Sequence, residues 1–178
     1  WKAPKATKLD KDIIISFVPP LWFPYTQEMS KEFRENWDGW SKTGAKLRFR
    51  PNLTHAGANM PIFYARQLAG DFSYACRNGM IATDFDSLLG AWSVQGPTLY
   101  TLVRIHEHPE WSVDKILDEY YSGFGSAAQS VKKYFDYWES HSNSLKEKDV
   151  KRYNIEEARR GRPAGSFKNY VLIVSRIF

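Results

Sequence analysis

The feature that most constrains the fold is the even spacing of three short apolar segments. These segments are residues 13–17, 46–50 and 80–83. Within them, Ile13, Leu47 and Ile81 follow one another at intervals of 34 residues. A strand that returns through a crossover helix to a parallel neighbour takes roughly 30 or more residues. The spacing therefore predicts three consecutive parallel strands joined by right-handed helical crossovers.

Between and after these segments, apolar residues recur at the spacing of an α-helix. The helices predicted to follow the three strands are residues 26–43, 61–78 and 98–106. After Pro109, helix follows helix, with predicted segments at residues 113–121, 126–140 and part of 154–160, whereas residues 167–178 fit either a strand or a helix. The sequence thus predicts three βα units over residues 1–108 and a helical extension over residues 109–178.

Length then limits the fold class. The chain has 178 residues, 43% hydrophobic and 25% charged, which is typical of a globular domain. A complete (β/α)₈ barrel takes about 250 residues. We therefore expect an α/β fold that is the C-terminal part of a TIM-type barrel. The absence of an initiator Met before Trp1 suggests that an N-terminal part of the same polypeptide is missing, and the uncapped apolar run at residues 170–174 suggests that the helical extension is truncated at its end.

Charge and composition exclude several classes of partner. The net charge is +5, and the two basic clusters, residues 146–152 and 159–162, lack the aromatic platform that nucleic-acid binding would need. No apolar run approaches the ~18 residues of a membrane span. Histidines and cysteines do not occur at metal-ligand spacing, so we predict neither metal nor cofactor. Cys76 is the only cysteine and is predicted to be buried.

Two carboxylates follow the third predicted strand and are the candidate catalytic residues. Asp84 and Asp86 alternate with Phe85, which places both on the face of Ala82. Such a pair could act as general acid and base, hold a metal or bind sugar hydroxyls. The alternative is structural, with Asp86 capping a turn and Asp84 paired with a basic residue on the neighbouring strand.

Polar and aromatic residues also follow the other strands, and the carboxyl ends of parallel strands are where α/β folds build their sites. Arg50 shares a face with Arg48, and guanidinium groups there would suit either a packed barrel interior paired with Asp84 or a uronate pocket. The aromatic rings could stack on sugars. The candidate ligand-binding residues are Trp22, Tyr25, Arg50, Asn52, His55, Asn59, Trp92 and Gln95.

Several of these segments resemble a known family. They are residues 47–52 (LRFRPN), the loop at 55–57, residues 79–88 (GMIATDFDSL), 92–96 (WSVQG) and 118–128 (DEYYSGFGSAA). The chain resembles, over residues 13–139, a bacterial glycoside-hydrolase-like family catalogued as a domain of unknown function and common in secreted proteins of polysaccharide-degrading bacteria. That family looks related to α-glucuronidases and β-hexosaminidases. The resemblance implies a (β/α)₈ barrel whose last strands are present here and whose acid/base carboxylate precedes Trp1, and it carries over Asp84 and Asp86 as the acidic pair.

We therefore expect a secreted or periplasmic glycoside hydrolase-like protein that acts on a polysaccharide or oligosaccharide without a cofactor. One alternative is a non-catalytic carbohydrate-binding or degenerate barrel domain that uses the same loops. A third is a metal-dependent transferase that uses Asp84-Phe85-Asp86 as an Asp-x-Asp motif, although no nucleotide-binding signature accompanies it.

Overall fold

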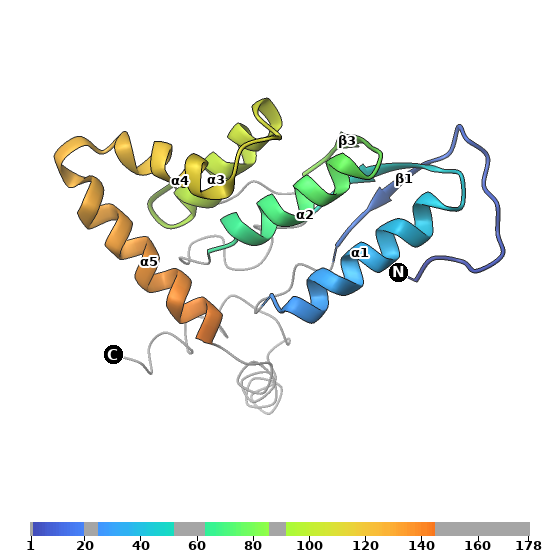
Figure 1. Ribbon diagram of the computed structural model, residues 1–178, viewed down its shortest axis with the longest axis horizontal. Helices are drawn as coiled ribbons and strands as arrows, with labels where there is room; N and C mark the ends of the chain where they lie inside the picture. The colour runs from blue at the N-terminus through green and yellow to red at the C-terminus, as the bar shows by residue number, and fades with distance from the viewer. Residues whose placement is uncertain (1, 20–24, 52–62, 86–91, 145–178) are drawn as a thin grey trace, which may run out of the picture.

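The computed structural model describes residues 2–19, 25–51, 63–85 and 92–144. Its elements alternate between strand and helix at first and are helical afterwards (Figure 1). In chain order they are β1 (Ile14–Phe17), α1 (Gln27–Ser41), β2 (Lys46–Phe49), α2 (Ala65–Arg77), β3 (Met80–Thr83), α3 (Trp92–Glu107), α4 (Val113–Ser122), the 3₁₀ turn η1 (Gly125–Ala127) and α5 (Ala128–Ser144).

The three strands form one parallel sheet in the order β1-β2-β3, which confirms the prediction from the 34-residue interval. In register, Phe17 lies beside Phe49, and Phe49 beside Thr83. A bulge in β3 leaves Ile81 without an opposite residue in β2. Met80 pairs with Leu47, and Ala82 pairs with Arg48.

Each crossover helix returns to the sheet through a glycine. Gly44 follows α1 with φ of 98° and Gly79 follows α2 with φ of 82°. These values lie in the left-handed region, which glycine enters at little cost. At the other end of α1, Thr26 caps the helix by accepting a hydrogen bond from the backbone N–H of Met29. Both turns from helix to strand therefore use the same backbone conformation.

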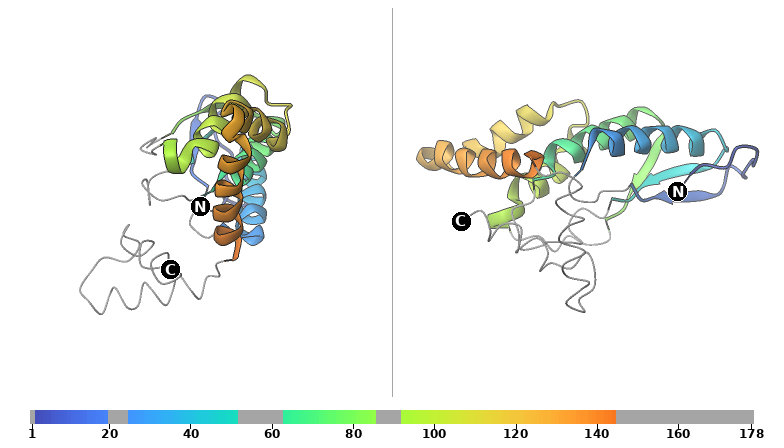
Figure 2. Two further views of the ribbon diagram at one scale, coloured as in Figure 1. Left: turned by 90° about the vertical axis from the view of Figure 1, so that its left-hand side faces the viewer. Right: turned by 90° about the horizontal axis from the view of Figure 1, so that it is seen from below.

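Helices α1 and α2 cover one face of the sheet (Figure 2). The strands contribute Phe17, Leu47 and Phe49 to the core on this side, all at most 4% exposed. Opposite them, the helices contribute an apolar stripe whose buried members are Phe33, Trp37, Leu68, Ala69, Phe72 and Ala75. These inward positions of both helices match the helical periodicity of the sequence.

No described element covers the other face of the sheet, which we call the uncovered face. It carries Ile14, Ser16, Arg48 and Ala82, and Ile14 is 56% exposed. Parallel sheets occur almost only with both faces buried, either between helices or around a barrel interior. The apolar character of Ile14 and Ala82 therefore indicates a surface that is suited to contact with other protein.

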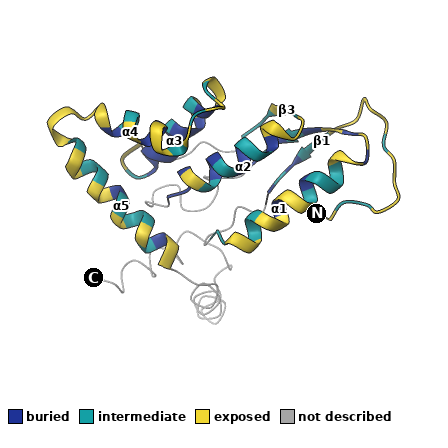
Figure 3. Cartoon of the chain, viewed as in Figure 1, coloured by how far each residue is buried: buried dark blue, intermediate teal, exposed yellow. Residues whose placement is uncertain are grey.

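The helices that follow β3 pack one after another, α3 on α2, α4 on α3 and α5 on α4. Helix α3 lies against α2 and α4, and Arg104 of α3 forms a two-pronged ion pair with Glu119 of α4 at 2.9 Å through each arm. Close approach of α3 and α4 also requires Gly96, because a Cβ there would lie 2.1 Å from the hydroxyl oxygen of Tyr120. The outer surfaces of α4 and α5 are largely exposed (Figure 3).

Two predictions from the sequence are wrong. The third helix begins at Trp92 and runs through Pro97 instead of starting after it, because eight of its residues are buried and this packing outweighs the one backbone bond that proline removes. Cys76 is exposed, since it lies one position beyond the buried face that ends at Ala75. The predicted helix at residues 154–160 and the segment 167–178 lie outside the described residues.

Candidate functional site

A cluster of polar side chains lies at the carboxyl end of the sheet, on the uncovered face. Backbone hydrogen bonds continue one residue beyond the strands: the N–H of Arg50 donates to Phe17 O and the N–H of Asp84 to Phe49 O, both at 2.9 Å. These bonds bring Arg50 and Asp84 side by side. Because side chains alternate along a strand, both lie on the face opposite to Phe49.

The cluster is held by ion pairs on one carboxylate oxygen. Nε of Arg50 lies 3.1 Å and Nη2 of Arg48 3.5 Å from Oδ2 of Asp84. Arg48 also donates through Nε and Nη2 to Oγ of Ser16, at 3.0 and 2.5 Å. The side chain of Asp84 stays 39% exposed. The four residues thus connect all three strands at one end of the sheet.

This arrangement holds Asp84 in position and leaves it able to bind a ligand. Among the described residues, its Oδ2 makes both ion pairs, whereas its Oδ1 makes no ion pair or side-chain hydrogen bond. A fixed, partly exposed carboxylate can accept hydrogen bonds from sugar hydroxyls or stabilise a positively charged transition state. The predicted pairing of Asp84 with a basic neighbour is confirmed, and it does not remove the carboxylate from solvent.

Tyr25, which was predicted to stack on a sugar, is partly buried and hydrogen-bonded within the protein. Its ring packs against the core, and its hydroxyl donates a hydrogen bond to Oδ2 of Asp71 in α2. Burial, together with the negative charge of Asp71, raises the pKa of Tyr25. Sugar contact by Tyr25 stays a prediction, but its hydroxyl is already used to fix the start of α1 against α2.

Asp71 was missed by the sequence analysis. Its side chain is 1% exposed, and burial raises its pKa to about 6 although hydrogen bonds from Tyr25 and Ser30 and the charge of Arg34 oppose this rise. Its position in the sequence could have indicated that it is buried, because it lies three residues after Leu68 on the apolar face of α2. A carboxylate there must have a partner, because burying an unpaired charge is costly.

The raised pKa of Asp71 predicts a specific pH dependence. The folded protein binds this proton more tightly than the unfolded chain, so the contribution of Asp71 to stability is most favourable below pH 4 and falls as the pH rises to about 6. We expect Asp71→Asn to be more stable relative to wild type at pH 7 than at pH 4, by up to about 3 kcal/mol. Urea unfolding at both pH values measures this difference.

Tyr25→Phe serves as the comparison for this prediction. It removes the hydroxyl that favours the Asp71 carboxylate, so stability should fall more steeply between pH 4 and 7 than in wild type. Equal pH profiles for wild type, Tyr25→Phe and Asp71→Asn would contradict the assignment.

The other predicted site residues divide into exposed, buried and undescribed. Trp92 begins α3 and is 57% exposed, whereas Gln95, in the next turn, is 2% exposed. Both remain predicted ligand-binding residues. Five predicted residues lie outside the described part of the chain: Trp22, Asn52, His55, Asn59 and Asp86.

His106 of α3 is a histidine, a residue type common in active sites, and it lies near the end of β3. Its Nε2 lies 2.8 Å from Oγ1 of Thr83 and its Nδ1 2.6 Å from the carbonyl of Leu102. Its ring packs against Phe72 and Phe85. With both nitrogens in contact and Thr83 beside Phe49 in register, His106 fastens β3 to α3 on the helix-covered side.

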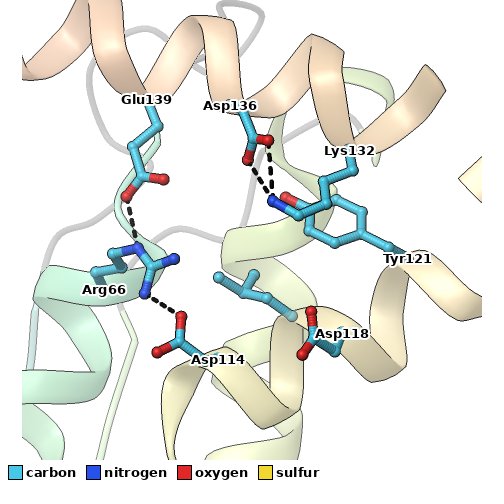
Figure 4. Close-up of a pocket in the computed structure, with 8 residues that line it drawn as sticks. Arg66, Asp114, Asp118, Tyr121, Lys132, Asp136 and Glu139 are labelled. Atoms are coloured by element: carbon cyan, nitrogen blue, oxygen red, sulfur yellow. Dashed lines mark hydrogen bonds and ion pairs between the residues drawn. The ribbon is translucent and has the colours of Figure 1, made fainter. Parts of the chain in front are cut away.

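A pocket of about 220 Å³ lies between α2, α4 and α5 (Figure 4). Arg66 bridges the helices, with Nη1 2.6 Å from Asp114 and Nε 2.8 Å from Glu139. Across the pocket, Lys132 pairs with both oxygens of Asp136 at 2.9 Å. Burial raises the pKa of Glu139 despite Arg66. Three of the four carboxylates that line the pocket are already in ion pairs. We therefore interpret these side chains as an ion-pair network that holds the helices together.

The described residues contain neither a metal-binding cluster nor a membrane-spanning helix. Within residues 2–19, 25–51, 63–85 and 92–144, no group of three or more His, Cys, Asp or Glu side chains is arranged to hold a metal ion. In the same part of the chain, no helix has both the length and the apolarity to cross a membrane.

The fold and the polar cluster define a class: an α/β chain whose parallel strands carry an Asp–Arg cluster at their carboxyl ends. Residues 1–136 match the family described as "Domain of unknown function (DUF4838)", and the chain belongs to this family. No curated protein and no solved structure shows significant similarity to the chain.

Proposed function

We propose that this chain is the site-bearing part of a TIM-type barrel in a glycoside hydrolase-like protein that acts on a polysaccharide or oligosaccharide. The observation that carries the proposal is the partly exposed carboxylate of Asp84, held by two arginines at the carboxyl end of the parallel sheet. Barrel enzymes build their sites at this end of their strands. Asp86 completes the proposed acidic pair.

The uncovered face supports the barrel part of the proposal. In a closed parallel barrel, strand residues alternate between an outer face packed on helices and an inner face packed on other strands. Phe17, Leu47 and Phe49 pack on the helices, as the outer face requires. Ile14 and Ala82, together with the Arg–Asp cluster, then form the inner face.

A carbohydrate-binding domain without catalysis is the second candidate. It is favoured by the ion pairing of Asp84, since arginine–aspartate pairs also occur as structural elements of barrel interiors. Turnover separates the two functions. The whole protein, incubated with a library of plant and algal glycans, should release reducing ends from at least one member if it is a hydrolase, whereas binding without release favours the second candidate.

Trp92 provides a test of sugar contact that does not depend on turnover. We expect Trp92→Ala to lower affinity for the bound glycan about tenfold, because an exposed ring that stacks on a ligand contributes to binding and little to folding. Isothermal titration calorimetry measures the affinity and thermal unfolding the stability.

Tyr137→Ala is the matched control, because Tyr137 is 46% exposed but lies on α5, away from the strand ends. Its affinity should equal that of wild type. A large stability loss in Trp92→Ala with unchanged affinity would identify Trp92 as a packing residue.

A further inference from the structure

The charge of Arg48 is incompletely matched by its partners. Its hydrogen bonds, from Nε and Nη2, go to the neutral hydroxyl of Ser16. The nearest carboxylate oxygen, Oδ2 of Asp84, lies 3.5 Å from Nη2, whereas charge-assisted bonds of this type measure about 2.7–2.9 Å. Serine therefore orients the guanidinium group without neutralising it.

Arg48 and Arg50 share one carboxylate oxygen of Asp84. The same Oδ2 atom is closer to Arg50, at 3.1 Å. Arg48 therefore makes the longer of the two ion pairs with Asp84. Arg48 lies on a face that no described element covers, and its side chain is 39% exposed.

The free edge of Arg48 has the shape of an anion receptor. Nη1 makes no hydrogen bond or ion pair with the described residues, and Nη2 uses only its contacts to Ser16 and Asp84. The Nη1–Nη2 edge of a guanidinium group presents parallel N–H donors that match two oxygens of a carboxylate or a sulfate. The bond to Ser16 fixes the plane, which lowers the entropy lost on binding.

We propose that Arg48, oriented by Ser16, binds an acidic group of the ligand, a carboxylate or a sulfate ester, on the uncovered face. This inference rests on the proposed function for its sugar ligand and adds the substrate class, an anionic glycan. The position of Arg48 in β2, next to Ala82 and close to Asp84, places that acidic group beside the candidate catalytic carboxylate.

Inorganic sulfate tests the anion site alone. The melting temperature of the whole protein is measured in millimolar sulfate and in chloride of equal ionic strength. Sulfate should raise the melting temperature of wild type and of Arg77→Gln, whose arginine is exposed at the end of α2, but not that of Arg48→Gln. An equal response of wild type and Arg48→Gln would overturn the anion site.

Paired glycans test the substrate class and distinguish the two acidic groups. Calorimetry compares oligogalacturonate with its carboxyl-reduced form, and a sulfated galactan with its desulfated form. Arg48→Gln should lose about tenfold or more in affinity for one acidic member and nothing for the neutral members. Asp84→Asn should bind the same acidic member more tightly, because it removes the competing negative charge.

The outcomes separate this inference from the proposed function. Equal affinity of wild type for acidic and neutral glycans overturns the substrate class, even if glycans are hydrolysed. Sulfate binding that depends on Arg48, without binding of any glycan, supports the anion site and rejects the glycan function. An acidic glycan bound through Arg48 but not cleaved supports the inference together with the binding-domain alternative.

Discussion

Replacing Trp37 by alanine is expected to lower the free energy of unfolding by about 3 to 5 kcal/mol, the usual loss for a fully buried large aromatic residue. The indole is 0% exposed and packs between Phe17 at 5.7 Å and Phe33 at 5.9 Å between ring centroids. Its N–H donates to the carbonyl of Asn78 at 2.9 Å, at the turn that leads into β3. The substitution therefore removes core volume and the hydrogen bond that ties α1 to this turn.

Urea unfolding followed by circular dichroism measures this loss. Trp92→Ala is the control, since it makes the same change at a residue that is 57% exposed, and it should stay within about 0.5 kcal/mol of wild type. Similar losses for both variants would show that Trp37 does not hold α1 against the sheet.

Replacing Asp84 by asparagine in the whole protein is expected to lower turnover by about a hundredfold or more, the usual contribution of an acid–base or charge-stabilising group. Asparagine keeps the size of the side chain but can neither carry a negative charge nor accept a proton. Arg48 and Arg50 would retain an acceptor, so the loss should fall on turnover and not on folding. Kinetics on the glycan that the library identifies would measure it.

Asp12→Asn is the matched control for Asp84→Asn. Asp12 also pairs with a basic residue of β2, Lys46 at 3.7 Å, but at the amino end of that strand. Its loss should leave turnover unchanged. Near-native turnover in Asp84→Asn with stable folding would reduce Asp84 to a structural partner of Arg50.

The repeating part of the fold could be predicted from the sequence, because it depends on local patterns. The strands at residues 13–17, 46–50 and 80–83 differ from β1, β2 and β3 by at most one residue at an end. The buried positions of α1, such as Phe33 and Trp37, follow from their spacing of four. The pairing of Arg50 with Asp84 was one of two open alternatives, since register fixes neighbours but not the roles of side chains.

The remaining features depend on contacts between distant residues, which no local pattern specifies. Tyr25 meets Asp71 across 46 positions of sequence, and Arg66 meets Glu139 across 73. The sequence pattern puts the start of the third helix after Pro97, because the burial that carries α3 through this proline comes from other helices. Polar residues on apolar faces, such as Asp71, are the signal that such contacts exist.

Arg66 joins α2 to both α4 and α5 through two ion pairs. Its guanidinium group is shared between Asp114 of α4 and Glu139 of α5 (Figure 4). Among the described residues of α5, only Phe135 and Ser142 are buried, so releasing this helix exposes little apolar surface. In such a sub-global opening Arg66 would exchange Glu139 for water yet keep Asp114. The amide hydrogens of α5 would then exchange with solvent while those of the sheet remain protected, and the helix would behave as a separate cooperative unit.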